Sequence, residues 1–223
     1  MFFELLAFAV TSYIVGFSGA ITPGPLFGVV IIRSVRGVPK AGPLASLGHS
    51  LVEIILLFLL ILGLSLVLMS EALRAVIGVA GGAFLVITGV TTIWRSRIVP
   101  MKQLLGQDGR GWEASNTLIA GLMATLSNPF FFLWWATIGN AMLLEGMAIA
   151  GVLGALVFYF FHISSDFTWY SLVSFSLGKG RKMMSDSVYS AILMAVGTFL
   201  VLLGGYFLVE GGSRLVGCLT VYR

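Results

Sequence analysis

Charged side chains are scarce in this sequence, since Asp, Glu, Lys and Arg together make up only 10% of its 223 residues. An ordinary soluble domain carries roughly 25%. Apolar side chains make up 58% of the chain, and the mean hydropathy is +1.04. A soluble domain of this length cannot bury so much apolar surface, whereas a bilayer accepts helices that are apolar on every face. The composition therefore excludes an ordinary soluble fold and predicts an all-α integral membrane protein.

Several groups that carry chemistry are missing. Cys218 is the single cysteine, which excludes an intrachain disulfide, a paired-thiol redox relay and a cysteine-cluster metal site. The sequence has no phosphate-binding GxxxxGK[ST] loop and no dinucleotide fingerprint, and no lysine lies within an apolar run to form a Schiff base. We therefore expect no enzyme activity, no cofactor, no resident metal and no ATP-driven transport by this chain alone.

The basic side chains are present in excess, with a net charge of +4, but they fall in short clusters between apolar runs. This spacing argues against a nucleic-acid partner, which would need one continuous basic face. Ten of the thirteen cations lie in three connections. They are Arg33, Arg36, Lys40, Arg95, Arg97, Lys102, Arg110, Lys179, Arg181 and Lys182. The positive-inside rule predicts that these connections are cytoplasmic and that both termini lie outside.

Six apolar runs reach the length of about 20 residues that a membrane-spanning helix needs. They cover residues 5–32, 44–69, 75–94, 117–139, 147–177 and 188–209. The first run has no basic leader and exceeds signal-peptide length, so we expect it to be retained as a helix. A polar stretch over residues 95–115 reads as a cytoplasmic linker between halves of about 1–94 and 116–210. We therefore expect one transmembrane domain over residues 1–223.

The two halves share a pattern that points to an inverted repeat. Because each half has three helices, an odd number, the second half starts on the opposite side of the membrane and is inverted relative to the first. The first helix of each half is interrupted by proline, at Thr22, Pro23, Gly24 and Pro25 and again at Asn128 and Pro129. Proline frees backbone groups that lipid cannot satisfy, so such a break belongs beside a polar cavity. Either break alone is equally well explained as a packing kink, but the matched pair favours a transporter binding site.

The second helix of each half carries a histidine followed by an acid four residues later. The pairs are His49 with Glu53 and His162 with Asp166, and a spacing of four places both members on one helix face. Both carboxylates lie about 18 Å along their helices from the cytoplasmic end, near mid-membrane. An ionised carboxylate there costs roughly 2.5 to 3.5 kcal/mol. We therefore expect these groups to act in gating or proton coupling, the alternative being structural pairs that fix helix packing.

Three stretches resemble the LysE-type amino-acid exporter family. They are TPGP at residues 22–25, RSVRGVPKAGPLASLGH at 33–49 and SNPFFFLWWATIG at 127–139. The resemblance implies efflux of amino acids or related small metabolites across the plasma membrane, driven by a proton or potential gradient. It also implies that Thr22 to Pro25, Asn128 and Pro129 contact the solute, and that the chain forms a homodimer. A lysine often follows the Asn-Pro pair in that family, whereas Phe130 stands here, so a role of that cation does not carry over.

Three alternatives stay open from the sequence. The broader group of exporters includes divalent-metal transporters, and two His-acid pairs at mid-membrane suit Zn, Ni or Co as the transported solute. An intramembrane enzyme would use a His-acid pair for acid-base chemistry, although no accompanying nucleophile is found. A structural membrane subunit would use the same polar groups only to fix helix packing.

Overall fold

The computed structural model describes residues 2–38, 40–63, 70–98, 112–180, 183 and 185–221. The elements assigned within these ranges are all helical. Six of the helices are long and apolar enough to cross a membrane, which confirms the predicted all-α, six-helix architecture. They are Phe2–Ala20, Ala41–Ile61, Glu71–Trp94, Pro129–Ala150, Val152–Gly180 and Asp186–Gly217.

Two shorter helices accompany the spans at the positions where proline predicted breaks. The first apolar run divides into α1 (Phe2–Ala20) and α2 (Pro25–Val35). The fourth divides into α7 (Trp112–Leu126) and α8 (Pro129–Trp134). After α8 the chain continues through the π-helix η1 (Trp135–Gly139) into α9 (Asn140–Ala150). Both predicted interruptions are therefore confirmed as breaks of the helix.

Local side chains form hydrogen bonds with some of the backbone groups at the breaks. At the first break the Thr22 hydroxyl donates to the Ser18 carbonyl at 2.7 Å, and Pro25 needs no hydrogen-bond acceptor at the start of α2. At the second, the Ser127 hydroxyl donates to a carbonyl of the preceding turn, and the Phe130 amide donates to Asn128 Oδ1 at 3.1 Å. Asn128 is thus the N-cap of α8. The unwound backbone is stabilised from within each break.

The boundaries of the fourth and fifth spans differ from the sequence prediction. The sequence placed a span at 117–139, whereas the structure continues the helix to Ala150, and α7 precedes it as a half-length helix. The exposed Glu145 lies inside α9 and does not end it. The chain turns at Gly151, whose φ of +58° favours glycine, and α10 (Val152–Gly180) follows. Residues 64–69 and 99–111, within the predicted second span and linker, lie outside the described residues.

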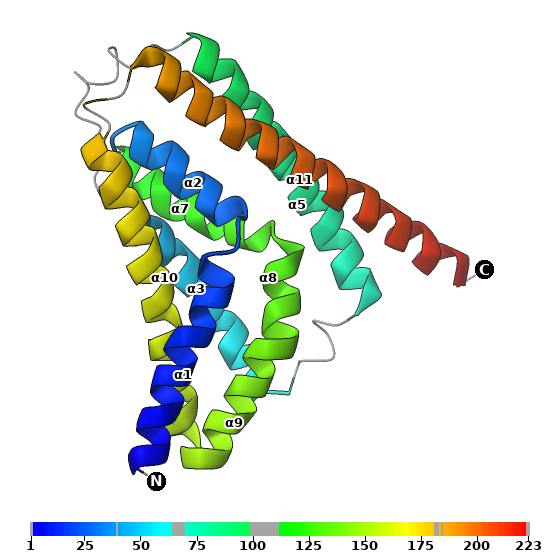
Figure 1. Ribbon diagram of the computed structural model, residues 1–223. Helices are drawn as coiled ribbons and strands as arrows, with labels where there is room; N and C mark the ends of the chain where they lie inside the picture. The colour runs from blue at the N-terminus through cyan, green and yellow to red at the C-terminus, as the bar shows by residue number, and fades with distance from the viewer. Residues whose placement is uncertain are drawn as a thin grey trace.

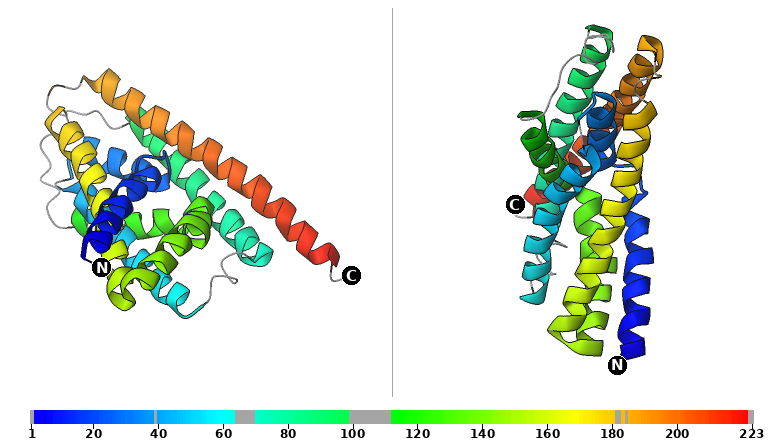
Figure 2. Two further views of the ribbon diagram at one scale, coloured as in Figure 1. Left: turned by 60° about the horizontal axis from the view of Figure 1, so that its bottom comes forward. Right: turned by 90° about the vertical axis from the view of Figure 1, so that its left-hand side faces the viewer.

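The helices form two groups (Figure 1). In one, α1, α9 and α10 lie side by side, and α3 (Ala41–Ile61) packs against α7 and α10. In the other, α5 (Glu71–Ile98) and α11 (Asp186–Val221) form a long pair that crosses the first group obliquely, as Figure 2 also shows. The half-length helices α2 and α7 contact each other between these groups. The two breaks lie next to these helices, and residues 21–23 of the first break are exposed whereas Ser127 of the second is buried.

Glycines allow α5 and α11 to pack closely. A Cβ atom built on Gly82 would lie 2.7 Å from the Gly204 carbonyl oxygen, too close for any real side chain. Arg214 of α11 links the same pair through ion pairs with Glu71 of α5 and Glu210 of α11. Close backbone approach at small residues is a common way for membrane helices to associate.

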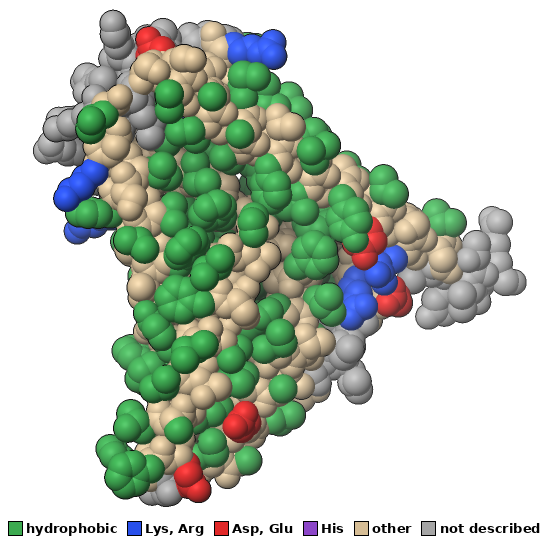
Figure 3. All heavy atoms as spheres, viewed as in Figure 1, with side chains coloured by type: hydrophobic (Ala, Val, Ile, Leu, Met, Phe, Trp, Pro, Cys, Tyr) green, Lys and Arg blue, Asp and Glu red, His purple; other side chains and the backbone are tan. Residues whose placement is uncertain are grey.

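Apolar side chains are spread over much of the visible outer surface, and charged ones gather at a few places (Figure 3). Large exposed apolar residues occur on several spans, among them Phe58, Val152, Leu202 and Val209. Exposing such a surface to water would raise the free energy of the protein, whereas contact with the hydrocarbon of a bilayer would not. The surface is that of a protein whose helices face lipid.

Candidate functional site

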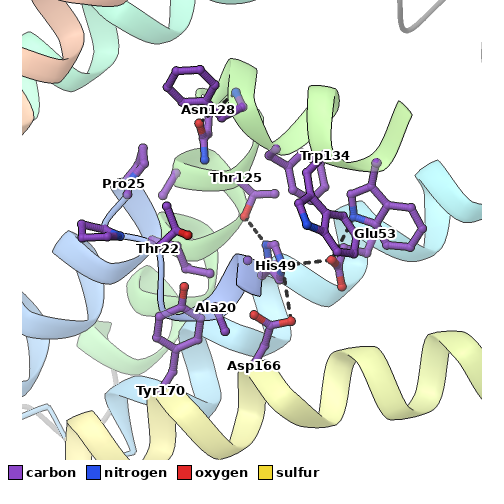
Figure 4. A pocket seen from close by; sticks show the side chains of 18 of the residues that line it. Ala20, Thr22, Pro25, His49, Glu53, Thr125, Asn128, Trp134, Asp166 and Tyr170 are labelled. Carbon is purple, nitrogen blue, oxygen red and sulfur yellow. Dashed lines mark hydrogen bonds and ion pairs between the residues drawn. The ribbon is translucent and has the colours of Figure 1, made fainter. Parts of the chain in front are cut away.

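The two helix breaks open onto one cavity of about 260 Å³. A Cβ atom built on Gly24 would lie 3.7 Å from Asn128 Nδ2, so the breaks adjoin each other. Nine of the ten residues predicted from the sequence line this cavity (Figure 4). These are Thr22, Pro23, Gly24, Pro25, His49, Glu53, Asn128, His162 and Asp166. The tenth, Pro129, lies outside the lining and instead starts α8.

Glu53 of α3 lies at the centre of the polar cluster in this cavity. Its Oε1 atom is 3.1 Å from His49 Nε2 and 3.0 Å from His162 Nε2. The indole N–H of Trp135 donates to the same oxygen at 3.1 Å. Three nitrogen atoms from α3, α10 and η1 therefore converge on one carboxylate oxygen.

Asp166 of α10 completes the cluster at a slightly greater distance. Its Oδ2 atom lies 3.9 Å from the Nε2 atoms of both His49 and His162. His162 is thus closer to Glu53, on another helix, than to the acid on its own helix. The sequence predicted two His-acid pairs, and the His49–Glu53 pair is present. Because α3 packs against α10, however, His162 approaches Glu53 and the two pairs merge into one four-residue cluster. We call His49, Glu53, His162 and Asp166 the quartet.

The quartet is almost completely buried. Glu53 is 1% exposed, and His162 and Asp166 are each 3% exposed. Three of its polar atoms, Glu53 Oε2, His162 Nδ1 and Asp166 Oδ2, have no hydrogen-bond partner among the described residues. Buried polar atoms are usually paired, so each unpaired one needs an explanation. Atoms of this kind around a cavity suit a site that receives a proton or a polar ligand.

Thr125 of α7 fixes where one proton of the quartet lies. Its hydroxyl donates to the Gly121 carbonyl at 2.8 Å and stands 2.8 Å from His49 Nδ1. A hydroxyl has one proton to donate, so when Thr125 donates to Gly121 it accepts a hydrogen bond from the Nδ1–H group of His49. The other ring nitrogen of His49, Nε2, then forms a hydrogen bond with Glu53 only if an additional proton lies between them. The geometry therefore provides a position for one transferable proton.

Aromatic rings enclose the quartet on the side of α8 and η1. Trp134 stacks on His162 with ring centroids 4.8 Å apart, and Phe131 meets His49 edge-on at 5.4 Å. Trp135 sits at the start of the π-helix, a distortion that often marks functional sites. The rings exclude water from the charged atoms and so strengthen their mutual electrostatic interactions.

Sequence reasoning missed three residues of this site. Thr125 and Trp135 bond the quartet directly, and the buried Tyr170 lines the cavity. Tyr170 could have been predicted from the sequence, because it follows Asp166 by four residues and therefore lies on the same face of the helix. Trp135 lies in the aromatic run that follows Asn128 and Pro129, but its contact with Glu53 depends on how η1 packs against α3. The contact of Thr125 with His49 likewise depends on how α7 packs against α3.

The quartet also has the donor atoms of a cation site. One ligand atom from each of His49, Glu53 and Asp166 lies within 4.8 Å of the others, and all three residues are buried. Imidazole nitrogen and carboxylate oxygen are ligands that suit divalent ions such as Zn, Ni or Co. The geometry is thus compatible with either a proton or a divalent cation.

Six candidate spans, two discontinuous helices and a cavity that the buried quartet lines are together typical of polytopic secondary transporters. The chain belongs to the LysE type translocator family, whose model matches residues 17–211. It is also similar to the chemotactic transduction protein ChpE of Pseudomonas aeruginosa, with 27% identity over 138 residues. That match covers 62% of this chain and 66% of the relative, just under two thirds of its length. No solved structure gives a significant match.

Family membership confirms the resemblance found in the sequence. The chain is thus a member of a translocator family with six helices long and apolar enough to cross a membrane.

Proposed function

We propose that this protein exports amino acids or related small metabolites from the cytoplasm in exchange for protons. The observation that carries this proposal is the single cavity in which both helix breaks and the buried quartet meet. Discontinuous helices beside a mid-membrane site are typical of secondary transporters. A buried cluster of two imidazoles and two carboxylates is typical of proton relays in such proteins.

The cavity offers complementary groups for a zwitterionic solute. Its volume of about 260 Å³ lies just below the roughly 300 to 1,000 Å³ of pockets for drug-sized ligands, which suits a smaller molecule. The eleven-residue helix α2 begins at the cavity, and its N-cap Gly24 supplies no side-chain hydrogen bond. The first-turn N–H groups and helix dipole would attract the solute carboxylate. The solute ammonium group would lie toward Glu53 and Asp166.

This orientation explains how solute and proton would be exchanged. A solute ammonium and the additional proton of the quartet both require the negative charge of Glu53 and Asp166. Since the two cations compete for the same carboxylates, binding of one favours release of the other. Protons entering from outside would then replace the solute, and the inward proton gradient would drive efflux.

The remaining expectations about orientation and assembly belong to the same proposal. The three basic connections would be cytoplasmic, and both termini would lie outside. The halves at about 1–94 and 116–210 would form one domain and rock against each other about the cavity. The homodimer implied by the family resemblance is likewise part of the proposal.

Efflux from preloaded proteoliposomes under an imposed pH gradient tests the proposal. Wild type and the Asp166→Asn variant would be compared with a panel of radiolabelled amino acids. We expect gradient-dependent efflux of at least one amino acid by wild type and its loss in the variant. Equal efflux with and without the gradient would reject proton coupling.

Divalent-metal export is the second candidate, and the close approach of His49, Glu53 and Asp166 ligand atoms favours it. In this case the metal ion would be the transported solute. The same proteoliposomes loaded with Zn²⁺, Ni²⁺ or Co²⁺ and a fluorescent metal indicator distinguish the candidates. Gradient-driven metal movement without amino-acid movement would replace the first proposal with the second.

A further inference from the structure

A second cavity, of about 550 Å³, lies at the other end of α2 and α10. Its walls are the last turn of α2, the turn that leads into α3, and the last turns of α10. None of the residues that line it also lines the cavity of the quartet. It is therefore a separate site on the side of the molecule where the basic connections lie.

The described lining of this cavity is basic and rich in hydroxyl groups. It includes Lys40, Lys179, Ser34, Ser171 and Ser174, and it contains no Asp or Glu. Lys40 lies immediately before α3 with a left-handed φ of 56°. Lys179 Nζ lies 4.3 Å from the centroid of the Phe175 ring on the same helix. Two cations without a lining carboxylate favour an anionic ligand.

Ser34 provides an independent sign of a ligand. Its side chain is 1% exposed, and its Oγ atom has no hydrogen-bond partner among the described residues. A buried hydroxyl without a partner is unfavourable, and an acceptor oxygen bound in the cavity would satisfy it. Hydroxyl and ammonium groups together are the donors that bind phosphate or carboxylate oxygens.

The depth of the cavity in the membrane indicates which anion is available. Lys179 follows Asp166 by thirteen residues on α10, which at 1.5 Å per residue is about 20 Å. Half of the hydrocarbon core is about 15 Å, so Lys179 lies at the level of the lipid headgroups when Asp166 is near mid-membrane. Leu172 and Phe175 of α10 are 56% and 61% exposed, and offer apolar contacts for acyl chains beside the cavity.

We propose that this cavity binds the phosphate group of an anionic phospholipid. Lys40 and Lys179 pair with the phosphate, and the Ser34 hydroxyl donates a hydrogen bond to one of its oxygens. Basic pockets between membrane helices on the cytoplasmic side are suited to such headgroups. The bound lipid joins the ends of α2 and α10, two helices that also contribute to the solute cavity. This site goes beyond the proposed transport function and does not depend on it.

Native mass spectrometry of the full-length protein, titrated with phosphatidylglycerol or with zwitterionic phosphatidylcholine, tests this inference. We expect selective retention of phosphatidylglycerol, with binding weakened about fivefold by Lys40→Gln or Lys179→Gln and about 25-fold by the double variant. Arg97→Gln is the matched control, because this cation of α5 does not line the cavity. Ser34→Ala should weaken binding about threefold or more.

Three results would overturn the inference. The first is equal retention of phosphatidylglycerol by wild type and the double lysine variant. The second is equal retention of both lipids, which would mean that only apolar contacts hold them. The third is retention of inorganic phosphate or a free amino acid at concentrations where phosphatidylglycerol is not retained. This result would assign the cavity to a soluble anion. Unchanged lipid binding in Ser34→Ala would exclude that hydroxyl from the site.

Discussion

Glu53 has the most demanding position in the molecule, because three donors converge on one of its oxygens while the other has no partner among the described residues. A glutamine in its place would still accept hydrogen bonds but would not take up a proton. We therefore expect Glu53→Gln to lower gradient-driven efflux by about 100-fold, the contribution of a well-placed proton-transfer group. Efflux from proteoliposomes measures this effect.

Glu145→Gln is the matched control for that prediction. Glu145 is exposed on α9 and does not line the solute cavity, so the same chemical change should leave efflux unaffected. Thermal unfolding in detergent should show that both variants remain folded. If Glu53→Gln transports as well as wild type under the same gradient, Glu53 does not carry the coupling proton.

Thr125 acts on the quartet through His49. Thr125→Val removes the acceptor of the His49 Nδ1–H group and leaves that group unpaired in a buried site. We expect a loss of about 1 to 3 kcal/mol in unfolding free energy together with reduced efflux. Denaturation followed by fluorescence, alongside the efflux assay, measures both effects. The control Thr92→Val removes a buried hydroxyl that bonds only its own helix, so it should preserve efflux.

The sequence predicted the ionisable residues of the candidate site and the His49–Glu53 contact, but not the contact between His162 and Glu53. A spacing of four along a helix places His162 and Asp166 on one face, and this much is local geometry. The shorter contact of His162 to Glu53 depends on the packing of α10 against α3, which no local pattern encodes. The contacts of Thr125 and Trp135 with the quartet were not predicted for the same reason. Residue types therefore indicated which side chains to consider, and tertiary packing determined their partners.

At the scale of single elements, Asn128 is the cap that starts α8. Its Oδ1 atom accepts the Phe130 amide at 3.1 Å. Asn128→Ala should destabilise the protein by about 1 kcal/mol, the usual effect of losing an N-cap. Asn128→Ser retains a capping oxygen and should recover most of this loss in thermal unfolding. Equal destabilisation by both variants would show that the amide acts through another contact.

The close packing of α5 against α11 leads to a second prediction about elements. A Cβ atom on Gly204 would lie 2.7 Å from the Gly82 carbonyl oxygen, whereas one on Gly205 would meet no atom within 4 Å. Gly204→Ala should therefore separate the helices and cost about 1 to 3 kcal/mol. Gly205→Ala is the adjacent control and should unfold at or above the wild-type temperature. If the two variants unfold at the same temperature, the helices tolerate a wider separation.

The positions of the helices were largely predictable because apolar length and proline are local signals. The breaks at 21–24 and 127–128 followed from Pro25 and Pro129. The turn at Gly151 was not predicted, because the sequence ended the fourth apolar run at residue 139 and began the fifth at 147, and the positive φ of Gly151 is visible only in the structure.

At the scale of the whole molecule, the proposed topology gives each connection a definite side of the membrane. With three spans in each half, the α9–α10 turn would lie outside and the α10–α11 connection in the cytoplasm. Val152 and Met183 mark these places, and they are 66% and 91% exposed. Each can be replaced by cysteine in a chain whose Cys218 has been changed to serine.

A membrane-impermeant thiol reagent applied to intact cells should label Val152→Cys at once and Met183→Cys only after permeabilisation. The physical reason is the excess of lysine and arginine in the connections at Arg33 to Lys40 and Lys179 to Lys182, which are retained in the cytoplasm during insertion. The Cys218→Ser chain alone controls for labelling of other groups. The opposite labelling pattern would reverse the orientation and place the lysine-lined cavity on the outer side of the membrane.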